Sequence, residues 1–163
     1  MRYTVVSTSE WLYPDRFAYA TGSDRIRLDA ARGGLVGAQL LLKDVSRCPD
    51  VSFELNGAEA ELFEMIPIPV EKDVTRPLPG NDTGAARDPK EDGRYSGMRP
   101  WTIEPGFLSR KAPFFVYDCL KPLEQGCAAR EDAVGLYVRV KAPDAPGSYT
   151  GAVRIGEVSV PVE

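Results

Sequence analysis

Apolar and polar side chains alternate with a period of two in several short segments of this chain. Residues 25–29 read Arg-Ile-Arg-Leu-Asp, and residues 51–55 place apolar side chains at every second position. Residues 133–141 (AVGLYVRVK) alternate in the same way from Leu136 to Val140. This pattern is typical of a strand with one face in the core and the other in water. We therefore expect β-strands in these segments.

Other segments are apolar without strict alternation. Residues 35–43 (LVGAQLLLK) are long enough for a strand or a helix, and the Gly33-Gly34 pair before them favours a buried strand. No segment has the periodicity of a convincing amphipathic helix. About eight short strands separated by turn residues predict an all-β fold, an antiparallel β-sandwich of the immunoglobulin or fibronectin kind. Further strands are expected at residues 1–7, 60–70, 113–117, 149–155 and 158–162.

Turn residues indicate how some strands connect. Asn56-Gly57 is a strong hairpin signal, and Gly156-Glu157 predicts a tight hairpin before the last strand. Prolines cannot donate backbone hydrogen bonds, and residues 60–70 contain two of them. This segment is therefore expected to be an edge strand or an extended run.

From residue 71 to residue 112 the alternation is lost, and proline, glycine and charged residues dominate. Such a long irregular loop in a compact domain is often functional. It contains aromatic side chains for the C–H faces of a sugar ring, and Arg and Asp for its hydroxyls. We select Asp92, Tyr95, Arg99 and Trp101 as candidate saccharide-binding residues. Two alternatives stay open: the aromatic side chains pin the loop onto the sandwich, or the loop packs against another domain.

A second aromatic cluster comprises Trp11, Tyr13 and Phe17. Core packing at one end of the sandwich is the favoured interpretation, and a ligand platform is the alternative. Acidic residues are numerous, but alternating acids on strands are usually a solvated face. We therefore predict no catalytic pair. We predict no metal site either, since no EF-hand spacing is present. No cofactor is expected, and Gly33-Gly34 is not a phosphate loop because no Lys-Ser or Lys-Thr follows it.

Composition limits the function further. The 163 residues fit a single domain, and the net charge of −4 comes without a basic stripe, which argues against nucleic-acid and membrane-surface binding. No apolar run could span a membrane, and no signal peptide is visible, so the cytoplasm is expected unless a leader was removed. The chain has no histidine, which excludes Ser-His-Asp and Cys-His catalysis and most zinc sites. The three cysteines lack a CxxC spacing; free thiols are favoured and one bridge stays open.

Three segments resemble the N-terminal sandwich of bacterial DUF4091-type glycoside-hydrolase-like proteins. Residues 30–42 are similar to the motif ARNE-x-x-x-x-Q-x-x-L, with Arg32 and Gln39 in place but Gly33-Gly34 instead of Asn-Glu. Residues 117–123 resemble YPD-x-L-x-PL, and residues 134–155 resemble LWV-x-V-x-VP-x-DAPAG-x-YTG-x-V-x-I. In that family a barrel domain follows the sandwich and carries catalysis.

The resemblance implies that residues 1–163 are one sandwich domain from the N-terminal part of a longer protein. Its expected role is that of a non-catalytic accessory domain, which supports or shapes the carbohydrate site of the following domain. That domain, a carbohydrate and a second copy of the chain are the expected partners, and the exposed edge strands would be covered by one of the two protein partners. The alternatives are a self-sufficient carbohydrate-binding module and an immunoglobulin-like spacer without a ligand.

Overall fold

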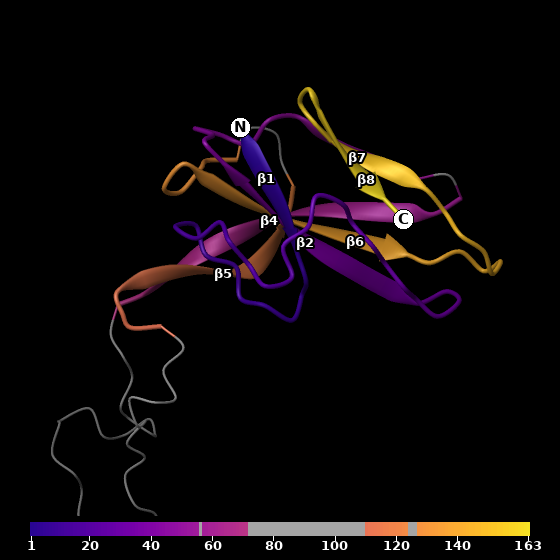
Figure 1. The fold of residues 1–163 in the computed structure, drawn as a ribbon, viewed down its shortest axis with the longest axis horizontal. Helices are drawn as coiled ribbons and strands as arrows, with labels where there is room; N and C mark the ends of the chain where they lie inside the picture. Colours follow the sequence, from indigo (N-terminus) through magenta and orange to yellow (C-terminus); the bar gives the residue numbers. More distant parts are fainter. Residues whose placement is uncertain (56, 72–109, 124–126) are drawn as a thin grey trace, which may run out of the picture. The chain divides into compact units, whose positions relative to one another are not determined.

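The computed structural model describes residues 1–55, 57–71, 110–123 and 127–163. In this part of the chain, eight strands form two antiparallel sheets and there is no helix (Figure 1). The predicted antiparallel β-sandwich is thereby confirmed. In spatial order, the larger sheet contains β1 (Arg2–Val6), β2 (Leu35–Lys43), β6 (Ala133–Lys141), β4 (Glu59–Val70) and β5 (Phe114–Pro122). The smaller sheet contains β3 (Val51–Leu55), β7 (Gly151–Ile155) and β8 (Val158–Val162), also in spatial order.

The chain divides into two units. The first contains Met1–Pro69 and Phe115–Glu163, and therefore nearly all of both sheets; the second is Val70–Phe114. Within the second unit, the guanidinium carbon of Arg110 lies 5.0 Å from the ring centre of Phe114. None of the described residues belongs to a helix that could cross a membrane. All four candidate saccharide-binding residues of the long loop lie outside the described residues; these are Asp92, Tyr95, Arg99 and Trp101.

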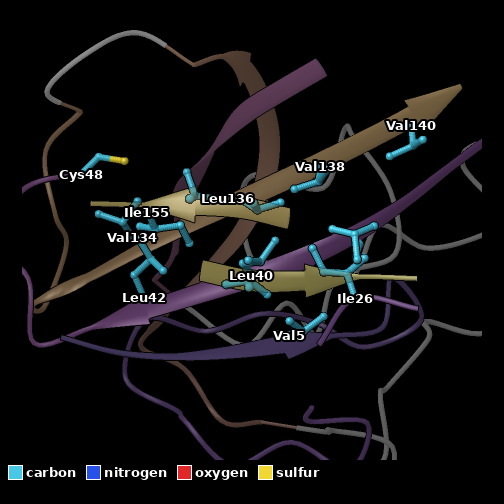
Figure 2. Close-up of a cluster of buried hydrophobic side chains, with 14 residues drawn as sticks. Val5, Ile26, Leu40, Leu42, Cys48, Val134, Leu136, Val138, Val140 and Ile155 are labelled. Atoms are coloured by element: carbon cyan, nitrogen blue, oxygen red, sulfur yellow. The ribbon is translucent and has the colours of Figure 1, made fainter. Parts of the chain in front are cut away.

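The register of β2 and β6 explains the core between the sheets. Leu40 pairs with Leu136, and the positions two residues away on either side are also aliphatic, so the same face of both strands is apolar. These side chains pack against the aliphatic side chains of β7 and β8, and Ile155 has no exposed surface (Figure 2). Burial of one such side chain stabilises the fold by about 1.5–3 kcal/mol relative to exposure. The alternation predicted for residues 133–141 and the buried strand predicted at residues 35–43 are both confirmed.

Two of the predicted connections have different outcomes. Gly156 adopts a φ of 55°, and β7 pairs with β8 through the expected two-residue hairpin. The hairpin expected at Asn56-Gly57 is wrong, because β3 pairs with β7 and lies in the smaller sheet, whereas β4 lies in the larger one. Gly57 does adopt a left-handed φ of 82°, but the turn passes the chain from one sheet to the other.

The prolines of β4 were expected to mark an edge strand or an extended run. Instead, β4 lies inside the larger sheet, between β6 and β5. Its register with β6 runs from Glu59 to Met65, so both Pro67 and Pro69 come after the end of that ladder. The two prolines therefore interrupt no hydrogen bond of the β4–β6 ladder, which is why they are tolerated in a strand inside the sheet.

The segment between β1 and β2 lines the edges of the sheets instead of forming a strand of its own. Ser23 exchanges two backbone hydrogen bonds with Val5 of β1, at 2.8 and 2.9 Å. Ile26 makes a parallel bridge to Val162 of β8, and Leu12 an antiparallel bridge to Tyr117 of β5. The alternation at residues 25–29 therefore reflects a buried Ile26 beside β8 and not the predicted strand. Part of three strand edges is covered by the chain itself, where we expected a partner.

Candidate functional site

The outer face of the larger sheet, turned away from the smaller sheet, carries a second apolar cluster. It is built from side chains that alternate with the core positions, such as Leu41 of β2, Met65 of β4 and Tyr117 of β5. Leu12, from the segment after β1, is fully buried among them. The segment after β1 therefore folds across this outer face, and its course decides which part of the face stays open.

Gln39 fixes the start of that segment. Its side chain is 5% exposed, and its amide nitrogen donates to the backbone oxygens of Ser7 and Glu10, at 2.9 and 3.0 Å. A buried amide that satisfies two backbone carbonyls is expensive to replace, because each carbonyl would lose its partner. Further along, the amide of Tyr117 donates to the oxygen of Leu12 at 2.9 Å. These contacts position Trp11, which lies between the two anchored points.

The side chain of Glu10 is held as well. Its carboxylate accepts a 2.7 Å hydrogen bond from the amide of Thr21. Hydrogen bonds from the side chain and the backbone of Thr21 lower the pKa of Glu10 below its ordinary value. The carboxylate is therefore a hydrogen-bond acceptor with a fixed orientation.

An open groove of about 340 Å³ lies beside this segment on the outer face. Its apolar surface comes from Trp11 and Leu120, which are 60% and 45% exposed, above the more deeply placed Met65, Tyr117 and Tyr137. Polar groups are present along the same groove; they come from Thr8, Ser9, Glu10, Gln39 and Asp118. The groove thus combines an exposed indole with carboxylates and hydroxyls.

The aromatic cluster near the N-terminus divides between packing and exposure. Tyr13 is 7% exposed, and Phe17 is half-buried against the outer-face cluster, with the guanidinium carbon of Arg2 at 4.8 Å from its ring centre. Core packing is therefore confirmed for these two residues. It is wrong for Trp11, whose side chain lies in solvent at the groove.

Several acidic residues in or next to the strands form ion pairs on the surface. The carboxylate of Glu61 accepts from Nε of Arg139 at 2.7 Å, and Arg154 pairs with Glu54 at 3.1 Å. Asp44 is bound by Arg2 at 2.7 Å, and this hydrogen bond lowers the pKa of Asp44. Among the described residues, no three acidic or thiol side chains lie together as a metal site.

The hydroxyl of Tyr117 is buried without a hydrogen-bond partner, and it is the one such side-chain atom within the described residues. Burial raises the pKa of Tyr117 above its ordinary value. The nearby backbone of Gly135 lowers the pKa of Tyr117 and so offsets part of this rise, but it forms no hydrogen bond with the hydroxyl. A buried polar group without a partner destabilises the fold by about 1–3 kcal/mol.

Tyr117→Phe is therefore expected to raise the free energy of unfolding by about 1 kcal/mol, measured by urea denaturation. Tyr19→Phe is the matched control. The hydroxyl of Tyr19 accepts from the amide of Tyr13 at 2.8 Å, so its loss is expected to lower stability by about 1 kcal/mol. Equal destabilisation by both substitutions would contradict the reading that the Tyr117 hydroxyl is unpaired.

Comparison of the sequence with models of known protein families and with curated proteins gives no match.

Proposed function

We propose that this chain is a non-catalytic accessory β-sandwich of a glycoside-hydrolase-like protein, and that its outer-face groove contributes to a saccharide site. The observation that carries the proposal is the exposed indole of Trp11 beside Glu10 and Asp118 in one groove. A sugar ring presents a C–H face and a rim of hydroxyls. An aromatic ring binds the first, and carboxylates accept hydrogen bonds from the second.

The size of the groove is consistent with a small part of a glycan. Ligand sites usually enclose about 300–1,000 Å³, and this groove lies at the lower end of that range. It is open to solvent, so a chain of sugars can pass along it while one or two rings contact Trp11.

The chemistry of Glu10 fits binding better than hydrolysis. A glycosidase needs one carboxylic acid with a raised pKa that protonates the leaving oxygen. The pKa of Glu10 is lowered by Thr21, so this group is ionised and accepts hydrogen bonds. Bond cleavage is therefore assigned to a following domain, as the sequence resemblance implies.

A self-sufficient carbohydrate-binding module is the second candidate. It is favoured by the fact that the indole, the carboxylates and the tyrosines of the groove all come from this chain. Titration calorimetry with the 163-residue chain and a panel of soluble glycans separates the two candidates. Saturable binding by the chain alone supports the module, whereas binding that needs the following domain supports the accessory role.

Trp11→Ala is expected to weaken saccharide binding about tenfold or more, because it removes the exposed aromatic face. If the chain is an accessory domain, Trp11→Ala is expected to raise the KM for glycan hydrolysis by the full-length protein about tenfold or more. Leu35→Ala is the control, since Leu35 is 66% exposed on β2 and does not line the groove. Unchanged binding and KM in Trp11→Ala, with the fold intact by circular dichroism, would favour a spacer without a ligand.

A further inference from the structure

Cys48 and Cys127 lie opposite each other on two antiparallel segments. Arg47 and Ala128 form an antiparallel bridge, and the amide of Cys48 donates to the oxygen of Cys127 at 2.8 Å. On the other side of the bridge, the amide of Ala129 donates to Ser46 at 3.4 Å. In this arrangement the two cysteines occupy a directly opposed pair, for which the Cα atoms are typically about 5.5 Å apart. A disulfide accepts Cα distances of about 4.4–6.8 Å.

The side chains of the two cysteines also meet. Cys48 is 5% exposed at the margin of the core (Figure 2). Cys127 packs half-buried against the same core. Both thiols are free, and each affects the pKa of the other. The two cysteines are therefore neighbours on opposed backbone positions, and a bond between them needs no rearrangement of the sheets.

The two thiols differ in reactivity. Burial raises the pKa of both thiols. Cys127 is the more exposed of the two, so it reacts first with an incoming oxidant. Cys48 is placed to attack the sulfur of Cys127 in the second step.

We propose that Cys48 and Cys127 form a redox pair that closes to an intramolecular disulfide when a small-molecule disulfide acts as oxidant. The Cys127 thiolate attacks one sulfur of oxidised glutathione, forms a mixed disulfide and releases one glutathione thiolate. The Cys48 thiolate then attacks Sγ of Cys127, forms the Sγ–Sγ bond and releases the second glutathione. The protein loses two electrons and two protons, and one glutathione disulfide becomes two thiols.

The disulfide joins the connection between β2 and β3 to the segment just before β6, across a long stretch of sequence. A bridge that closes a long loop restricts the unfolded chain more than the folded one. The oxidised form is therefore expected to have a Tm higher by roughly 5–10 °C. This redox role is independent of the proposed function.

The test uses the 163-residue chain with Cys119→Ser, which removes the exposed third thiol. The protein is treated with oxidised glutathione at alkaline pH, because both remaining thiols have raised pKa values. The expected product has lost the mass of two hydrogen atoms and yields a non-reduced peptide that joins residues 48 and 127. Its raised Tm returns to the starting value with dithiothreitol.

The same oxidation in urea provides the control for geometry. After glutathione has been added, the folded chain is expected to form the disulfide at least about tenfold faster than the unfolded chain, because the fold holds the two cysteines on opposed backbone positions. A folded chain that keeps both thiols, or that keeps glutathione on Cys127 beside a free Cys48, would overturn the proposal.

Discussion

Replacement of Gly151 by alanine is expected to destabilise the sandwich by about 3 kcal/mol or more. Gly151 is the first residue of β7 and pairs with Leu55 of β3. A Cβ atom at this position would overlap the carbonyl oxygen of Glu54 and lie 2.9 Å from Cα of Leu55. Both are backbone atoms of the paired strand, so the clash is relieved only if the strands move apart. Urea denaturation followed by circular dichroism measures the loss.

Gly147→Ala is the matched control in the loop before β7. A Cβ atom there is 3.7 Å from the nearest atom, in the ring of Tyr149, which is an ordinary contact. The free energy of unfolding is expected to change by less than about 0.5 kcal/mol. If both alanine variants unfold at the same urea concentration as the parent, the predicted clash between a side chain at position 151 and the backbone of β3 is wrong.

The sequence predicted those parts of the fold that depend on local signals. The alternation in residues 133–141 marks β6 because one face of that strand is buried and the other is not. Gly156 identifies the β7–β8 hairpin because a two-residue turn needs a left-handed φ. In both cases the interaction that decides the structure lies within a few residues of the pattern.

Pairing between distant segments could not be predicted in this way. Asn56-Gly57 has the composition of a hairpin turn, but β3 finds its partner in β7, far along the chain. The alternation at residues 25–29 correctly marks a buried Ile26, yet its neighbour is β8 in a parallel bridge. A strand pattern states which face is buried and says nothing about which strand lies beside it.

The groove was also missed, although one signal for it is present in the sequence. Gln39 is the single polar side chain in the apolar run Leu35–Leu42, and such a residue usually makes a buried hydrogen bond. Its partners turned out to be Ser7 and Glu10. The aromatic cluster gave no comparable signal, because only the course of residues 7–13 over the sheet separates the exposed Trp11 from the buried Tyr13.

The floor of the groove depends on Gly135 in β6. A Cβ atom at this position would lie 2.9 Å from Cδ1 of Tyr117 and 3.1 Å from Cβ of Met65. Both neighbours are at most 6% exposed, so neither can turn away into solvent. Gly135→Ala is therefore expected to lower the free energy of unfolding by about 2–3 kcal/mol and to weaken saccharide binding through the displaced tyrosine.

A double-mutant cycle tests whether the ring of Tyr117 is the cause of that loss. Tyr117→Ala removes the atoms that a Cβ at position 135 would meet first, so Gly135→Ala is expected to be about 1–2 kcal/mol less destabilising in that background. The two substitutions are in direct contact, which is the condition under which a coupling energy of this size arises. Additive effects would instead place the strain in the backbone of β6. In that case, Gly135→Ala would weaken saccharide binding in the Tyr117→Ala background as well, and the backbone of the sheet would determine the shape of the groove.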